Sequence, residues 1–422
     1  MKKNYFLVVL IMFVFFVISF LTNILGALND KVSQSFTLTE TMAGLLPFAF
    51  FIAYGIMSIP SGFWLEKYGE KKMMILAFLF AFTGALVFAL FPKFNVFVIS
   101  LFTIGAGMAA LQVVINPLLR VSGGETNYAF FSVMAQLVFG LASFISPQMY
   151  TYFVTNIDGG NVNKPLIGLM TTLVPKAMSW VSVYWVFALI AILMCVVVFL
   201  VKFPKVELQE DEKVGSKESY FELFKNKYVI LYFLGVFAYV GSEQGISYWM
   251  SKFLKQYHDI NPDLAGADAV SYFWGLMTIG GILGLVLMKL YDSKPILRWF
   301  TILAMVCVAI GLTASANISL WAFPMSGFFL SVMYPVVVSL GLNSVAKHHG
   351  SFAGILMTGI AGGAIVQLLI GAISDIVSLK VGMLFIFVTL GYILSLSFWA
   401  KPLVNNETVS LKSLFSKNKQ AV

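Results

Sequence analysis

The sequence has few charged residues. Only 11% of its 422 residues are Asp, Glu, Lys or Arg, and 59% are hydrophobic, whereas a soluble domain carries roughly 25% charged residues. Most of the chain therefore cannot face water. Apolar runs of about 20 residues, each long enough to cross the hydrocarbon of a bilayer as a helix, recur along it. We predict an all-α integral membrane protein with twelve transmembrane helices, at residues 5–29, 41–65, 71–91, 95–119, 128–154, 178–202, 228–254, 268–290, 297–315, 318–343, 351–374 and 380–400.

Cysteine and histidine are also scarce. Cys195 and Cys307 fall inside predicted helices, so no disulfide framework is indicated. The three histidines have no cysteine or acidic partner at the spacing of metal ligands. No nucleophile–base–acid constellation, nucleotide-binding loop or aromatic-interleaved basic patch is visible. We therefore expect no enzyme activity, no metal site, no cofactor and no nucleic-acid partner.

The positive charges are unevenly distributed between alternate loops. If both termini lie on the inner side, the inner segments hold 20 of the 27 Lys and Arg residues. Cytoplasmic loops carry such an excess, so both termini are expected in the cytoplasm. The N-terminal apolar run, preceded by Lys2 and Lys3, is too long for a secretory signal and is interpreted as a retained first helix.

One long charged stretch divides the predicted helices into two groups of six. Residues 203–227 contain six acids and five lysines, which is typical of a solvated cytoplasmic linker. We predict an N-terminal bundle at 1–202, a C-terminal bundle at 228–404 and a cytoplasmic tail at 405–422. This arrangement resembles the major facilitator superfamily, in which two parallel repeats enclose a substrate site near the midplane of the membrane.

The loop "GFWLEKYGEKK" after the second predicted helix resembles the signature loop of that superfamily. Its elements are Gly62, the acid–base pair Glu66 and Lys67, then Gly69 and a basic pair ending at Lys72. The resemblance implies a gating loop, in which a helix packs closely at the first glycine and the charges hold the inner helix ends in one state.

Further segments are similar to the fucose:proton symporter family of sugar transporters, which includes glucose and galactose permeases. They are "LQVVINPLL" (Leu111–Leu119), "GGE" (Gly123–Glu125), "AQ" (Ala135–Gln136), "YVGSE" (Tyr239–Glu243), "MYPVVVSLG" (Met333–Gly341) and "GGAIVQLLIGAISD" (Gly362–Asp375). The resemblance implies a monomeric symporter of the bacterial inner membrane that carries a hexose or related sugar by alternating access.

Two positions depart from the pattern of that family. Gln112 stands where the family has a carboxylate in its fourth helix, and an amide cannot titrate. Gly26 aligns with an aspartate of the first helix, and Asp30 follows one helical turn later on about the same face. Either Asp30 replaces the missing acid, or it caps the helix where it meets solvent.

Glu243 lies far inside the seventh predicted helix, past its midpoint toward the outer side. A charged side chain near the bilayer centre costs about 2.5–3.5 kcal/mol and is retained mainly for function. Because burial disfavours the ionised carboxylate, this group could hold a proton when the cavity is closed and release it to water. We predict that Glu243, with Asp30 as a second candidate, couples transport to a proton or sodium ion. The alternative is a hydrogen-bonded glutamate that only ties helices together.

A sugar needs amide or hydroxyl partners and a flat aromatic surface. The predicted substrate-binding residues are Asn23, Gln112, Asn116, Gln136, Gln244, Trp249, Trp274, Tyr334 and Gln367. The glycine-rich stretch "GIAGGA" (Gly359–Ala364) is interpreted as a close-packing segment of a helix.

These features together predict a secondary active transporter that imports a monosaccharide by symport with a proton or sodium ion, with membrane lipid as its surroundings. Two alternatives stay open. A drug exporter of the same superfamily is disfavoured because "FGLASFISP" (Phe139–Pro147) contains a single Gly and Pro in place of the fuller exporter signature. A non-transporting sugar receptor would bind solute without net flux.

Overall fold

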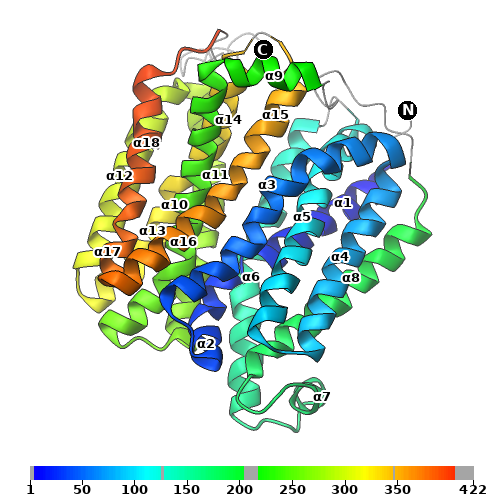
Figure 1. Ribbon diagram of the computed structural model, residues 1–422, viewed down its shortest axis with the longest axis vertical. Helices are drawn as coiled ribbons and strands as arrows, with labels where there is room; N and C mark the ends of the chain where they lie inside the picture. The colour runs from blue at the N-terminus through cyan, green and yellow to red at the C-terminus, as the bar shows by residue number, and fades with distance from the viewer. Residues whose placement is uncertain (1–3, 125–127, 204–216, 346, 404–422) are drawn as a thin grey trace, which may run out of the picture.

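The chain folds as a bundle of long helices that run up and down between two ends (Figure 1). The computed structural model describes residues 4–124, 128–203, 217–345 and 347–403. Within this part of the chain, twelve helices are long and apolar enough to cross a membrane, so the predicted number is confirmed. Four spans are interrupted and consist of two helices each: α1 (Tyr5–Thr22) with α2 (Leu25–Phe36), α13 (Ala316–Leu330) with α14 (Met333–Leu342), α15 (His349–Thr358) with α16 (Gly362–Ile376), and α17 (Leu379–Met383) with α18 (Phe385–Trp399). The others are α3 (Glu40–Tyr68), α4 (Glu70–Leu90), α5 (Phe94–Gly123), α6 (Tyr128–Asp158), α8 (Ser182–Leu200), α10 (Lys227–His258), α11 (Ala267–Leu290) and α12 (Ser293–Thr313).

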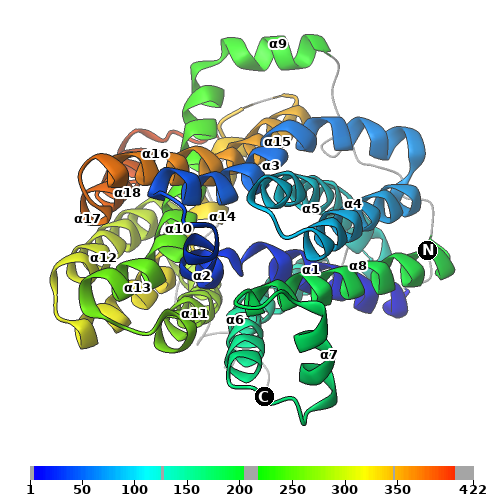
Figure 2. The same ribbon diagram turned by 60° about the horizontal axis from the view of Figure 1, so that its bottom comes forward.

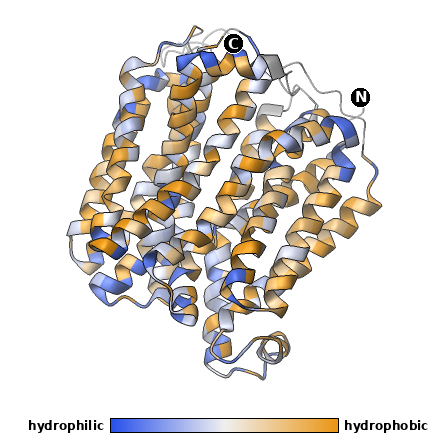
Figure 3. Cartoon of the chain, viewed as in Figure 1, coloured by the Kyte–Doolittle hydropathy of each residue, from blue (hydrophilic) through white to orange (hydrophobic). Residues whose placement is uncertain are grey.

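The sides of the bundle are apolar. Exposed leucine, isoleucine and phenylalanine side chains such as Leu200, Ile99 and Phe199 cover them, while hydrophilic residues gather at the two ends (Figure 3). An exposed apolar band over the length of the helices suits contact with lipid rather than water. The chain is therefore an integral membrane protein.

The helices form two groups. In Figure 1, α4, α5 and α8 lie on the right and α12, α17 and α18 on the left, with α2, α3, α15 and α16 meeting between them; we call α1 to α8 the N half and α10 to α18 the C half. The halves pack together through α2 and α10, α3 and α16, and α6 and α11. We call the end where α1 begins and α18 ends the terminal end, and the opposite end the far end.

Two short helices outside the spans were not predicted. Helix α7 (Pro165–Leu173) lies at the far end (Figure 1), and α9 (Lys217–Lys225) belongs to the predicted linker. Seen from the second direction, α9 extends beyond the outline of the bundle (Figure 2). Linker residues 204–216 and tail residues 404–422 lie outside the described part of the chain.

The glycine-rich stretch lets α16 approach α10 closely. A Cβ atom added at Gly362 would overlap the backbone carbonyl of Phe237, and one at Gly363 would lie 3.0 Å from the ring of Phe51. A larger residue at Gly362 would therefore force α16 away from α10. This agrees with the close packing predicted for the segment.

Candidate functional site

Glu243 lies near the middle of α10, 16 residues after Lys227 and 15 before His258. The predicted helix, which ended at residue 254, had placed Glu243 past its midpoint; the observed helix continues to His258. Its Oε1 atom accepts a hydrogen bond of 2.6 Å from the hydroxyl of Tyr239, and its Oε2 atom a longer one of 3.4 Å from the Gln244 amide. Among the described residues no cation pairs with it. The carboxyl group is thus held by neutral partners, which suits a group that exchanges a proton.

Four predicted substrate-binding residues carry buried polar atoms that find no hydrogen-bond partner in the described part of the chain. These atoms are Oε1 of Gln112, Nε1 of Trp249, Nε1 of Trp274, and both amide atoms of Gln367. They come from α5 in the N half and from α10, α11 and α16 in the C half. A buried polar group without a partner costs about 1–3 kcal/mol, so a polar ligand that reached these atoms would recover that free energy.

Gln367 belongs to α16, which packs against the part of α10 that carries Glu243. Its neighbour Val366 occupies the space next to Gly241, and Ile370 lies 3.3 Å from the position of a Cβ atom at Gly245. These two glycines lie on either side of Glu243 along α10. α16 thus packs on the face of α10 that carries the two glycines, whereas the Glu243 side chain, two residues from each of them, projects from about the opposite face of the helix.

The other predicted residues have different surroundings. Asn23 is buried where α1 ends, and its amide donates to the hydroxyl of Ser143 at 2.8 Å and, more weakly, to that of Ser19 at 3.4 Å. These hydroxyls, which the sequence analysis missed, satisfy its amide N–H groups, so Asn23 ties α1 to α6. The hydroxyl of Tyr334 lies 3.4 Å from the sulfur of Met357.

The three remaining amides of the predicted set differ in their exposure. Asn116 and Gln136 are exposed, whereas Gln244 is buried next to Glu243. Exposed amides in membrane-spanning helices are expensive in lipid, so the first two are expected to face a water-filled opening. Glu125 of the "GGE" motif lies outside the described residues.

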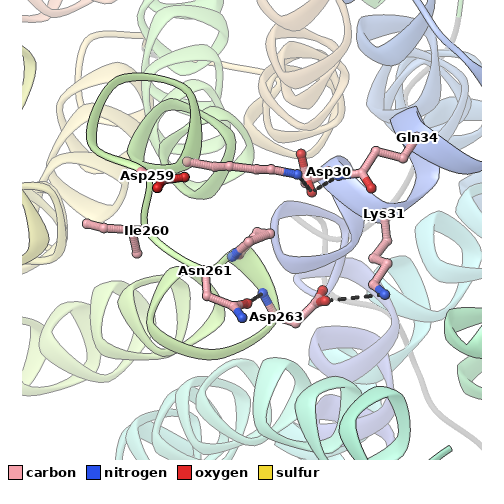
Figure 4. Close-up of a pocket in the computed structure, with 9 residues that line it drawn as sticks. Asp30, Lys31, Gln34, Asp259, Ile260, Asn261 and Asp263 are labelled. Atoms are coloured by element: carbon pink, nitrogen blue, oxygen red, sulfur yellow. Dashed lines mark hydrogen bonds and ion pairs between the residues drawn. The ribbon is translucent and has the colours of Figure 1, made fainter. Parts of the chain in front are cut away.

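Asp30 belongs to the far end and not to the surroundings of Glu243. It lies inside α2, six residues before the helix ends, so it does not cap the helix. Its carboxylate accepts from Lys255 Nζ at 2.7 Å and from the Gln34 amide at 2.5 Å (Figure 4). Lys255 lies 12 residues after Glu243 on α10, about 18 Å along the helix axis. The two candidate coupling acids are therefore in different parts of the molecule.

The Asp30–Lys255 ion pair borders a polar pocket of about 360 Å³ between α2 and the segment that follows α10. On the other side of this pocket, Lys31 pairs with Asp263 at 3.4 Å (Figure 4) and with Asp158 at 2.9 Å. Both the Asp30–Lys255 and the Lys31–Asp263 pairs join the N half to the C half.

The N-terminus of α3 is a second point where the halves are joined at the far end. The carboxylate of Asp375 on α16 accepts from the backbone N–H groups of Glu40 and Thr41 at 2.7 and 2.9 Å, and from the Thr41 hydroxyl at 2.5 Å. An anion is favoured there because a helix N-terminus has free N–H groups and a positive dipole end. Glu40 itself accepts from Lys252 Nζ at 2.6 Å. These bonds hold the far end closed.

The halves also meet backbone to backbone at Gly26. A Cβ atom there would overlap the carbonyl oxygen of Ser247 on α10. No side chain therefore fits at position 26 in this structure.

Gly26→Ala is therefore expected to open the far end. The overlap costs about 1–3 kcal/mol, enough to shift a two-state population by about 5- to 150-fold. The measurement is the distance between spin labels at Phe91 and Ile318, two exposed far-end residues of opposite halves, in protein without Cys195 and Cys307. Gly281→Ala is the matched control, because a Cβ atom there meets nothing within 4 Å. An unchanged distance in the Gly26 variant would contradict the prediction.

At the terminal end, the predicted gating loop joins α3 to α4. Gly69 separates the two helices with φ at +77°, a conformation that favours glycine. Lys71 donates to the carbonyl of Val201 after α8 at 2.8 Å. The pKa of Tyr220 on α9 is raised, mainly by burial and secondly by the negative charge of Glu66. The loop thus lies close to α9, which precedes the C half; its gating role stays a prediction.

Comparisons with known proteins agree with this architecture. A family model described as the Major Facilitator Superfamily matches residues 11–367. A glucose/galactose transporter of Brucella abortus is 26% identical over 402 residues, which cover 93% of each chain. The L-fucose-proton symporter of Escherichia coli is 28% identical over 384 residues, covering 86% of this chain and 85% of that one. The predicted resemblance to these transporters is thereby confirmed.

Solved structures share the fold. The fucose symporter crystallised in an outward conformation has a TM-score of 0.66 at 22% identity, covering 93% of this chain and 98% of that one. A bacterial homologue of the lysosomal transporter Spinster, in an inward-facing conformation, has a TM-score of 0.78 at 13% identity, covering 94% and 96%. With its two joined halves, its twelve spans and the family match over most of its length, the chain belongs to the Major Facilitator Superfamily.

Proposed function

We propose that this protein imports a monosaccharide, of the hexose class, by symport with protons. The observation that carries the proposal is the set of unpartnered buried groups on Gln112, Trp249, Trp274 and Gln367. Two indole N–H groups and an amide nitrogen donate, and two amide oxygens accept. All are neutral, so they suit a ligand with many hydroxyl groups, each of which both donates and accepts. Relatives named as glucose/galactose and L-fucose-proton transporters support this substrate class and ion.

We assign the coupling proton to Glu243. It is an acid in the middle of a membrane-spanning helix, hydrogen-bonded to Tyr239. Position 112 is an amide in this chain, whereas the fucose symporter family has a carboxylate there in its fourth helix. We propose that Glu243 carries the proton in place of that carboxylate.

We place both termini in the cytoplasm of a bacterial cell, with the protein as a monomer in the inner membrane. The excess of Lys and Arg at the terminal end supports this orientation. In this orientation the far end, where the ion pairs join the two halves, faces outward, and the structure is an inward-facing state.

Counterflow of radiolabelled hexoses in proteoliposomes tests the proposal, with pH and sodium gradients imposed separately. We expect exchange of at least one hexose, and accumulation driven by an inward proton gradient alone. Accumulation driven only by a sodium gradient would show that the coupling ion is sodium and not the proton. Binding without flux would indicate a receptor, and flux of amphiphiles without sugar an exporter.

A further inference from the structure

Lys252 is a charged residue in the interior of α10, one turn after Trp249. Its side chain is almost fully buried, and its ammonium group has neighbours on both halves. Nζ donates to Oε2 of Glu40 at 2.6 Å and to the hydroxyl of Ser33 at 3.2 Å. It also lies 5.8 Å from the ring centre of Trp249, within the range of a cation–π contact.

These neighbours separate when the far end opens. Ser33 on α2 and Glu40 on α3 belong to the N half and move away from α10, whereas Trp249 and Lys252 lie three residues apart on one helix and stay together. The ammonium group then loses its two oxygen partners. Opening lets water reach this ammonium group, and hydroxyl oxygens of a ligand bound beside the Trp249 ring can take the place of the two lost acceptors.

Trp249 is also the residue that links this ammonium group to the candidate sugar site. Its indole Nε1 is one of the buried donors that find no partner among the described residues. A sugar that binds along this ring presents hydroxyl oxygens, which are acceptors for an ammonium group.

We infer that Lys252 couples sugar binding to closure of the far end: its ammonium group binds hydroxyl oxygens of the sugar on Trp249 while the far end is open, and binds Glu40 when it closes. The inference rests on the proposed function, because it adds a substrate contact to the same site. It makes Lys252 a specificity residue as well as a gate residue.

Lys255 provides a matched control. It lies three residues further along α10 and also pairs across the halves, with Asp30 at 2.7 Å. Among the described residues no hydrogen bond or cation–π contact joins it to Trp249, which is six residues away. Removing its charge should therefore weaken the closed state without changing the sugar contact.

The test measures the far-end distance between labels at Phe91 and Ile318 in nanodiscs, with and without the hexose that the counterflow assay identifies. Lys252→Gln is expected to increase the open population and to raise the half-saturating sugar concentration about 10- to 100-fold, the effect of a lost hydrogen bond to a charged group. Lys255→Gln and Glu40→Gln are expected to increase the open population but to leave half-saturation within about threefold.

Exchanging the charges of Lys252 and Glu40 shows whether a changed open population is due to the lost ion pair or to misfolding. Lys252→Glu combined with Glu40→Lys restores the ion pair, so we expect the closed population to recover while sugar binding stays weak, because the ammonium group is no longer beside Trp249. Equal half-saturation in Lys252→Gln and Lys255→Gln would overturn the sugar contact. An unchanged open population in Lys252→Gln, or no recovery in the exchanged pair, would overturn the gate.

The result that would overturn the proposed function differs from the results that would overturn the role of Lys252. If no hexose exchanges in the counterflow assay or shifts the distance in the wild-type chain, the proposed function is wrong and the sugar contact with it. The charge exchange, measured without sugar, still decides whether Lys252 and Glu40 close the far end.

Discussion

Replacing Glu243 with glutamine is expected to abolish proton-driven accumulation of sugar and to leave sugar exchange intact. The amide still accepts a hydrogen bond from Tyr239, so the local structure is retained, but it carries no proton. One pH unit corresponds to about 1.4 kcal/mol, or a tenfold concentration ratio for coupling to one proton. Under such a gradient the wild-type chain should approach a tenfold accumulation, and the variant a ratio of about one, in proteoliposome uptake.

Glu222→Gln is the control for this prediction. Glu222 lies on α9 with an exposed side chain, paired with His348 at 3.3 Å, and has no part in the candidate site. We expect wild-type accumulation from it. Normal accumulation in the Glu243 variant would show that the carboxyl group is structural and that the proton is carried elsewhere.

The second large effect is expected at Gln367, with opposite signs for stability and binding. Gln367→Leu removes two buried polar atoms that have no partner in the described structure, so the sugar-free protein should gain about 1–3 kcal/mol of stability. The same change removes both sugar contacts and should weaken binding by about 10- to 100-fold. Thermal unfolding in detergent and a sugar titration measure the two effects.

Asn29→Leu is the matched control, because this buried amide already has a partner. It donates to the backbone carbonyl of Tyr248 at 3.0 Å, and its loss should lower stability. If Gln367→Leu is destabilised to the same extent, its amide is satisfied in the folded protein and is not reserved for a ligand.

The sequence predicted the twelve spans because each depends on a local run of apolar residues. Helices α7 and α9 were missed because they are only nine residues long, too short for the length criterion. The break after α1 was also missed: Asn23 lies in a continuous apolar run, and its partners Ser19 and Ser143 are recognisable only once α1 and α6 are packed together.

The candidate site could be predicted residue by residue but not as an arrangement. A buried glutamate and a set of amides and indoles in apolar helices are visible in the sequence. The sequence does not show which of these side chains lack a hydrogen-bond partner. In the structure Gln367 and Trp249 have buried atoms without a partner among the described residues, whereas Asn23 is bonded to Ser143.

The far-end gate was not visible at all. Lys252 and Lys255 were counted with the positive charges of the outer side, and their acids Glu40 and Asp30 are more than 200 positions away in the chain. Asp30 was predicted as a coupling acid or a helix cap. It lies inside α2 and does not cap that helix, and its ion pair with Lys255 is at the far end; its coupling role stays a prediction.

The spacing of the two lysines has a consequence for the kinetics of opening. Lys252 and Lys255 are three residues apart, on one face of a continuous helix. A rigid helix that moves away from the N half must break both ion pairs in the same displacement, so states with only one of them broken are not stable intermediates. Opening should therefore be all-or-none, with a single relaxation rate and no half-open population in single-molecule distance traces.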